Sequence, residues 1–173
     1  MNNITIKLLK KDDVKELLYF ETINRSYFEE TCLSRGDSYY DFNNLNRIIS
    51  ELVDEQNEGI NYMYIIRNSE DKIVGRINLV DIVRGNFNKA EIGYRIGKEY
   101  IGRGYGEKAV KLALYDAANK YKLHRIEAGV STENIASQKV LIKNGFSKVG
   151  TYNKYIFLNG KWSDSIIFEK LLD

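Results

Sequence analysis

The chain has 173 residues, 43% of them apolar and 29% charged, with a formal net charge of +2. These values suit one globular domain with a substantial core, so we expect residues 1–173 to form a single domain. Basic and acidic residues number 26 and 24 and are intermixed, which offers no basic face for nucleic acid. No apolar run approaches membrane-spanning length, and the one cysteine, Cys32, suits a reducing compartment. We therefore expect a cytoplasmic protein that binds neither nucleic acid nor membrane.

The first half of the chain predicts a strand, two helices and then a pair of strands. Alternating apolar residues predict a strand over 3–9, and helical spacing predicts a helix from Val14 to the high twenties. A second helix follows a polar segment and ends by Gly59. Residues 62–66 are apolar at successive positions, as expected of a strand covered on both faces. Residues 72–83 form its partner strand.

The central stretch predicts a strand, a glycine-rich turn and the start of a helix. Apolar residues alternate over 90–96, and Gly102, Gly104 and Gly106 follow at alternate positions. Downstream apolar residues then share one helical face to about Tyr121. Glycines let a backbone approach a ligand, and the first N–H groups of a helix favour a phosphate.

Spacing alone leaves two interpretations of these glycines open. A dinucleotide fingerprint would place a third glycine where Glu107 stands, and no Gly-Lys pair is followed by Ser or Thr as in a Walker loop. The glycines either approach another phosphate ligand or simply shape a tight turn.

The last third predicts a strand, a short helix and a terminal hairpin. A strand over 125–130 follows the central helix, which implies a right-handed crossover and parallel pairing. A helix over 135–143 stops at Asn144-Gly145, and the chain is extended from Phe146 to a turn at Asn159-Gly160.

Together the elements predict an α/β (α+β) fold with a mixed, mostly antiparallel seven-stranded sheet flanked by helices. We expect Trp162, in the last strand, to lie in the core and His124 to be structural.

The order of elements and three phrases resemble the GNAT acetyltransferase superfamily, in particular bacterial ribosomal-protein N-terminal (alanine/serine) acetyltransferases. The phrases are Ala90-Glu91-Ile92-Gly93-Tyr94, Gly102-Arg103-Gly104-Tyr105-Gly106, and residues 134–146. The resemblance implies the GNAT acyl-CoA N-acyltransferase fold, acetyl-CoA as co-substrate and no metal.

The resemblance also implies the coenzyme site. The pantetheine arm would pair with the strand at Tyr94, Arg95, Ile96 and Gly97. The pyrophosphate would accept hydrogen bonds from the N–H groups of the loop formed by Ile101, Gly102, Arg103, Gly104, Tyr105, Gly106 and Glu107. Asn134 would form a hydrogen bond with the pantetheine. Ser137 would lie near the thiol and act as the acid that protonates the leaving thiolate, directly or through water. The alternative for Asn134 and Ser137 is helix capping with solvation.

The chain departs from the superfamily pattern at two site positions. Ile101 stands where Gln or Arg is usual, and Ile156 stands where some relatives carry a proposed glutamate base. Glu91 is a substitute candidate for the catalytic base. The alternatives are a solvated carboxylate at the strand end, a base acting through water, or no base.

The resemblance implies that the two N-terminal helices wall the acceptor side. Arg25, Arg35 and Tyr39 are the candidate substrate-binding residues, and Cys32-Leu33 replaces a proline often found between them. The leading prediction is transfer of acetyl to the α-amine of a protein or peptide N-terminus, such as that of a ribosomal protein.

Two alternatives to this function remain. One is a polyamine or aminoglycoside acetyltransferase, for which converging carboxylates are available at Glu29, Glu30, Asp37 and Asp41. The other is a non-catalytic acyl-CoA-binding module. A monomer or a homodimer is expected.

Overall fold

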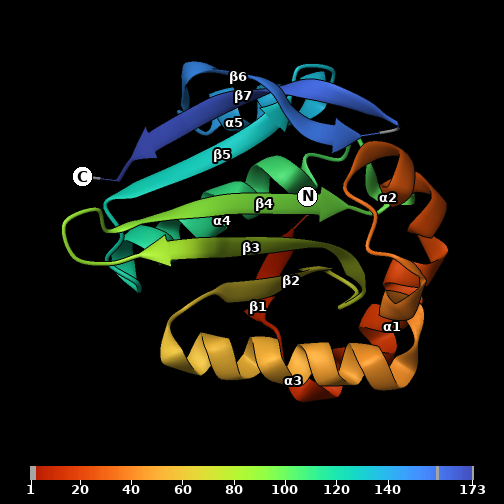
Figure 1. Cartoon of the computed structure of the whole chain (residues 1–173). Helices are drawn as coiled ribbons and strands as arrows, with labels where there is room; N and C mark the ends of the chain where they lie inside the picture. Colours follow the sequence, from red (N-terminus) through yellow and green to blue (C-terminus); the bar gives the residue numbers. More distant parts are fainter. Residues whose placement is uncertain (1–2, 159, 173) are drawn as a thin grey trace.

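The computed structural model describes residues 3–158 and 160–172, which form a seven-stranded sheet in the order β1-β2-β3-β4-β5-β7-β6 (Figure 1). All neighbouring strands are antiparallel except β4 and β5, which are parallel. The predicted mixed, mostly antiparallel sheet is confirmed. The strands are β1 Ile4–Leu8, β2 Tyr62–Asn68, β3 Ile73–Val83, β4 Lys89–Ile96, β5 Arg125–Ser131, β6 Ser147–Leu158 and β7 Lys161–Leu171.

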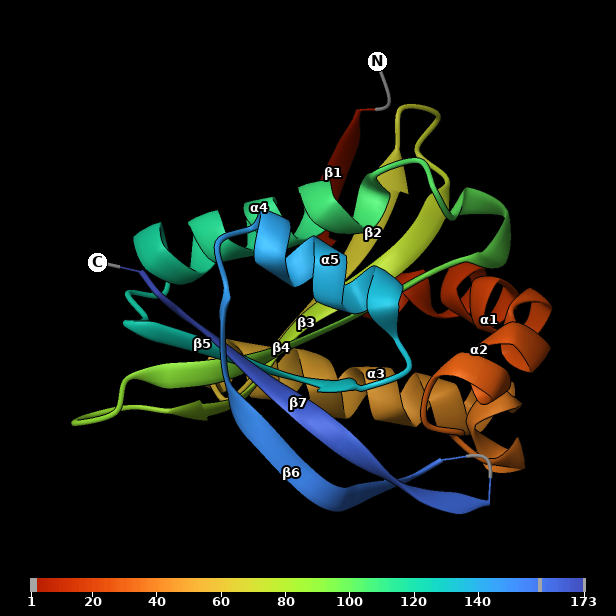
Figure 2. The ribbon, with the colours of Figure 1, turned by 90° about the horizontal axis from the view of Figure 1, so that it is seen from above.

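Helices cover both faces of the sheet (Figure 2). The α-helices are α1 Val14–Ile23, α2 Arg25–Thr31, α3 Phe42–Glu58, α4 Tyr105–Asn119 and α5 Ile135–Lys143. Short 3-10 turns lie at Lys11–Asp13, Asp37–Tyr40 and Lys98–Tyr100. Each face of the sheet has its own hydrophobic core. Helices α4 and α5 contribute to the core on one face, and α1 and α3 contribute to the core on the other.

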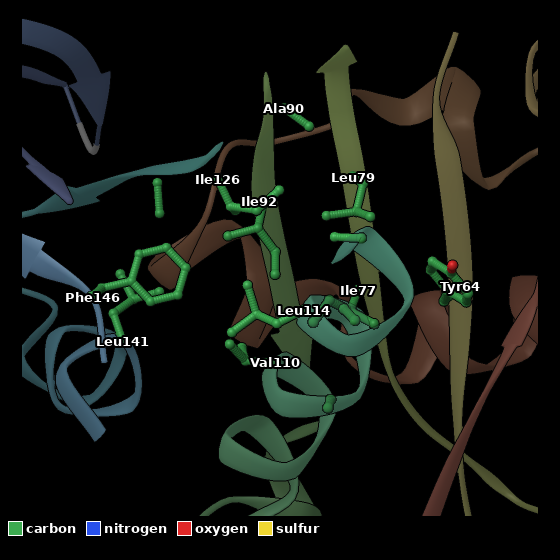
Figure 3. Close-up of a cluster of buried hydrophobic side chains, with 14 of the residues drawn as sticks. Tyr64, Ile77, Leu79, Ala90, Ile92, Val110, Leu114, Ile126, Leu141 and Phe146 are labelled. Carbon is green, nitrogen blue, oxygen red and sulfur yellow. The ribbon is translucent and has the colours of Figure 1, made fainter. Parts of the chain in front are cut away.

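Strand β2 has side chains in the hydrophobic cores on both faces of the sheet. Tyr64 and Ile66 belong to the core beneath α4, whereas Met63 and Ile65 belong to the core beneath α1 and α3. Successive side chains of a strand point to opposite faces, so an uninterrupted apolar run fits a doubly covered strand. Figure 3 shows the core on the α4 side, where Val110 and Leu114 of α4 meet the side chains of the sheet.

The first predicted helix is in fact two helices, α1 and α2, separated at Asn24. This buried residue has φ −98° and ψ 0°. Its Nδ2 donates to the carbonyl of Phe20 at 2.9 Å, and its Oδ1 accepts from the N–H of Lys98 at 2.8 Å. The break therefore ties the start of α2 to the end of β4, a long-range contact that helical periodicity cannot reveal.

The prediction for Trp162 was wrong. Its side chain is 61% exposed and packs edge-to-face on Phe157, with ring centroids 5.4 Å apart, on the hairpin of β6 and β7. Trp162 lies near the start of β7, whereas the core residues of this strand, Ile166 and Phe168, lie farther along it. Asn159, at the predicted turn, lies outside the described residues, and Gly160 beside it has φ +76°.

Candidate active site

Strands β4 and β5 pair over a short ladder and then separate. The ladder ends at Glu91 and Glu127, although β4 continues along β3 and β5 continues along β7. The sheet therefore opens between the carboxyl ends of two parallel strands. Some backbone N–H and C=O groups of β4 beyond Glu91 face this opening and are available to a ligand.

A cleft of about 630 Å³ occupies the opening. This is an ordinary volume for a small-molecule or cofactor site. Its lining comes from α2, β4, the glycine loop, α4, β5, α5 and the hairpin of β6 and β7. The lining residues include Tyr27, Phe28, Thr31, Cys32, Tyr94, Arg95, Ile96, Ile101, Gly102, Gly104, Tyr105, Gly106, Glu107, Ser131, Asn134, Ser137, Leu158, Lys161 and Ser163.

The glycine loop enters the cleft in a conformation that requires glycine. Gly102 and Gly104 both have φ +76°, in the left-handed region that side chains rarely adopt. A Cβ at either residue would meet no atom within 4 Å, so the backbone conformation rather than packing demands glycine. Helix α4 begins at Tyr105, immediately after the loop. Its first N–H groups have no intrahelical acceptor, so this wall of the cleft suits an anion such as a phosphate.

Arg103 was predicted to belong to the coenzyme site. Its guanidinium donates to the carbonyl of Glu99 at 2.9 Å and lies 5.4 Å from the centroid of the Tyr100 ring. Arg103 does not line the cleft, whereas Ile101 and Gly102, the two residues before it, do.

Helix α5 contributes Asn134 and Ser137 to the opposite wall. Asn134 is the N-cap, and its Oδ1 accepts from the N–H of Ser137 at 3.0 Å, so the predicted cap is confirmed. The Ser137 hydroxyl lies 2.8 Å from the Tyr94 hydroxyl, which comes from β4. Burial raises the pKa of Tyr94 to about 12. Tyr94 and Ser137 thus connect the two walls across the cleft.

Glu91, the candidate base, does not line the cleft. It is three residues before Tyr94 on an uninterrupted part of β4, so the two side chains project from opposite faces of the sheet. Desolvation, followed by the carboxylates of Asp81 and Glu127, raises the pKa of Glu91, and Lys89 opposes this. The structure therefore does not bring Glu91 and Ser137 together.

The three candidate acceptor residues also lie outside the cleft lining. Arg25 pairs with Glu29 at 2.9 Å and with Asp37. Tyr39 is buried and its hydroxyl accepts from Arg76, while the Arg35 guanidinium lies 4.6 Å from the centroid of the Tyr39 ring. These contacts hold the side chains among α2, the segment that follows it and β3. The cleft is instead lined on that side by α2.

A buried ionic cluster beside the α2 wall was missed by the sequence analysis. Arg76 Nη1 donates to Glu21 Oε1 at 2.8 Å, and Arg95 Nη1 lies 3.5 Å from Glu21 Oε2. Arg95 lines the cleft, with its guanidinium 4.8 Å from the centroid of the Phe28 ring. The one signal in the sequence was a lone arginine, Arg76, inside the apolar strand β3.

Comparison with known proteins identifies the class. Residues 3–147 match the family described as the acetyltransferase (GNAT) domain, and the chain belongs to this family. It is 36% identical over 162 residues, 93% of this chain and 90% of the other, to the probable N-acetyltransferase YjcK of Bacillus subtilis (strain 168).

Two solved structures share the fold over almost their whole length. The ribosomal-protein-S5-alanine acetyltransferase from Vibrio fischeri has a TM-score of 0.94 and 26% identity, covering 100% of this chain and 97% of the other. The spermidine N-acetyltransferase from Vibrio cholerae, in complex with CoA and spermine, has a TM-score of 0.84 and 19% identity, covering 98% and 95%.

The protein is thus an acetyl-CoA-dependent N-acetyltransferase with the GNAT fold. The open space at Gly102 and Gly104 and the unpaired first N–H groups of α4 fit the phosphates of this co-substrate. Among the described residues, no group of three or more His, Cys, Asp or Glu is placed to hold a metal. None of the described helices is long and apolar enough to cross a membrane.

Proposed function

We propose that this enzyme acetylates the α-amine of a protein or peptide N-terminus, such as that of a ribosomal protein. The observation that carries this proposal is the positive charge of Arg95, a residue of β4 that lines the cleft beside Phe28 of α2. The activity named for the Vibrio fischeri structure, alanine acetylation of ribosomal protein S5, supports the same class of acceptor.

We assign to the residues around the cleft the coenzyme-binding roles that the family resemblance implies. The backbone of Tyr94 to Gly97 pairs with the pantetheine arm, and the N–H groups from Ile101 to Glu107 bind the pyrophosphate. Asn134 contacts the pantetheine, and Ser137 lies at the sulfur. Open space at the glycines and the shared cleft lining support these assignments.

The reaction is a direct attack of the amine on the thioester. The amine nitrogen bonds to the carbonyl carbon, whose oxygen becomes an oxyanion, and the carbon–sulfur bond then breaks with its electron pair on sulfur. Backbone N–H groups of β4 beyond Glu91 stabilise the oxyanion. The nitrogen releases a proton to water and the sulfur gains one at Ser137, directly or through a water. The products are an amide and free CoA.

The charge near the α2 wall favours an acceptor with an acidic group over a polycation. One buried carboxylate, Glu21, faces the guanidinium groups of both Arg76 and Arg95. Arg35 lies nearby, and burial, together with Arg76 and Arg95, lowers its pKa. The net positive charge attracts a carboxylate next to the amine and repels a polyamine.

Polyamine acetylation is the second candidate function. Glu30 lines the cleft, and the spermidine N-acetyltransferase from Vibrio cholerae shares the fold. An aminoglycoside acceptor is a further alternative.

An acceptor screen separates these functions. Release of free CoA from acetyl-CoA is measured with a peptide that begins with Ala or Ser, the same peptide with a blocked N-terminus, spermidine and an aminoglycoside. We expect kcat/KM for the free peptide to exceed that for spermidine at least tenfold, with no turnover of the blocked peptide. A higher kcat/KM for spermidine would replace the peptide proposal by the polyamine one. No CoA release with any of these acceptors would overturn both the peptide and the polyamine proposals.

A further inference from the structure

Tyr94 and Ser137 form a hydroxyl pair that joins the two walls of the cleft. Tyr94 Oη lies 2.8 Å from Ser137 Oγ and 3.3 Å from the Ser137 carbonyl oxygen. We propose that Tyr94 is a positioning residue that donates its proton to Ser137 Oγ and so directs the Ser137 proton into the cleft. The inference rests on the proposed role of Ser137 at the sulfur and does not depend on which amine is the acceptor.

The fold places the tyrosine ring where this contact is possible. Tyr94 projects from β4 on the same face as Ile92, which packs beneath α4. A Cβ on Gly106, in the first turn of α4, would lie 3.7 Å from Tyr94 Cε2. The ring therefore passes the start of α4 where Gly106 leaves room for it, and its hydroxyl reaches α5.

Ser137 needs such a partner because its own hydroxyl can rotate. Asn134 Oδ1 accepts from the backbone N–H of Ser137 at 3.0 Å, which fixes the backbone but not the hydroxyl. A serine within a helix readily turns its hydroxyl proton back to a carbonyl three or four residues earlier. When Oγ accepts from Tyr94, one lone pair is occupied and the Ser137 proton remains available to a second partner.

Tyr94 is suited to donating a hydrogen bond rather than its proton. Its side chain is partly buried and its pKa is raised to about 12, so the hydroxyl stays protonated at neutral pH. Ser137 Oγ takes a proton from a water as it gives its own to the departing sulfur, so no alkoxide forms and the Tyr94 O–H bond stays intact.

The test is a double-mutant cycle with Tyr94→Phe and Ser137→Ala, measured in single turnover so that the acetyl-transfer step is observed. Tyr94→Phe keeps the ring and removes only the hydroxyl. We expect the single-turnover rate to fall about 5- to 50-fold, part of the range for a proton-transfer arrangement. The dissociation constant of acetyl-CoA, measured by calorimetry, should change less than twofold.

The double variant separates positioning from a structural effect. If Tyr94 acts through Ser137, the double variant has the rate of Ser137→Ala alone, whereas independent effects would multiply. Multiplying effects, or a Tyr94→Phe rate within twofold of the parent, would overturn the proposal. Circular dichroism and thermal unfolding verify that each variant is folded.

Tyr121→Phe is the matched control. Tyr121 is also buried, and its hydroxyl lies 2.5 Å from that of Tyr64, but it does not line the cleft. This variant should lose stability without losing rate. If spermidine is turned over and the peptide is not, the same rates measured with spermidine still test the hydroxyl pair.

Discussion

Arg76 donates from Nη1 to Glu21 Oε1 at 2.8 Å, and the two residues are only 4% and 0% exposed. The pair joins β3 to α1 beneath the α2 wall of the cleft. The second oxygen of the same carboxylate lies 3.5 Å from Nη1 of Arg95, a residue that lines the cleft. A core ion pair and a residue of the binding surface therefore share one carboxylate.

Glu21→Gln should destabilise the fold strongly, because it leaves the Arg76 charge buried without its counter-charge. Removing one partner of a buried pair typically costs about 3–5 kcal/mol. Urea unfolding followed by circular dichroism measures the change in the free energy of unfolding. Asp71→Asn is the control, because it breaks the exposed pair with Lys7 and should have little measurable effect. Equal effects of the two substitutions would contradict this prediction.

Gly104→Val should weaken acetyl-CoA binding at least tenfold, or about 1.4 kcal/mol. Gly104 has φ +76°, which a β-branched residue adopts only under strain, and a side chain there would project beside the cleft. Calorimetric titration with acetyl-CoA measures the loss.

Gly85→Val separates the loss of binding from simple backbone strain. Gly85 has φ +75° and open space around it, like Gly104, but lies in the turn between β3 and β4 and outside the cleft lining. Both variants should lose similar stability, and only Gly104→Val should lose affinity. The same affinity loss in both would remove Gly104 from the coenzyme site.

Much of the fold could be predicted from the sequence because its signals are local. Period-2 alternation marked β1 and β4, and the uninterrupted apolar run marked β2 as a doubly covered strand. The glycine loop and the cap at Asn134 are likewise signals within a few residues of chain.

The features that the sequence did not reveal depend on contacts between distant segments. Glu21 and Arg76 are 55 residues apart, and Tyr94 and Ser137 are 43 apart. Alternation assigned Tyr94 to a strand face but said nothing of what its hydroxyl would meet. The break at Asn24 was hidden for the same reason, since its partner Lys98 is 74 residues away.

Ser137→Ala should lower kcat by roughly 10- to 1,000-fold, the range for losing a group that assists proton transfer. Acetyl-CoA affinity should change little, because the hydroxyl matters mainly as the sulfur departs. Single-turnover rates and calorimetry measure the two quantities separately. Equal rates in variant and parent, with the chemical step rate-limiting, would show that Ser137 has no role in that step and is only a structural residue of the first turn of α5.

Arg95→Gln should raise the acceptor KM more for a peptide with an acidic second residue than for the same peptide with a neutral one. The substitution removes the charge of a residue that lines the cleft and keeps the β4 backbone that is proposed to hold the coenzyme. The KM for acetyl-CoA should therefore stay within twofold of the parent. Arg25→Gln is the control, since Arg25 was a candidate acceptor residue but pairs with Glu29 and Asp37 outside the cleft. An equal rise in KM for both peptides would argue against a carboxylate contact.

Glu91→Gln tests the candidate base by rate and by stability. Because Glu91 projects away from the face that holds Ser137, we expect kcat/KM to change less than threefold, and a fall of tenfold or more would restore it as the base. The pKa of Glu91 is raised in the folded protein, so its ionisation disfavours the fold. Stability should therefore fall as pH rises from the unfolded value of about 4.3 through the folded pKa. The variant lacks this loss, so its Tm should exceed the parent's at pH 7, and the difference should vanish near pH 4. A Tm difference independent of pH would show that charge at Glu91 is not its cause.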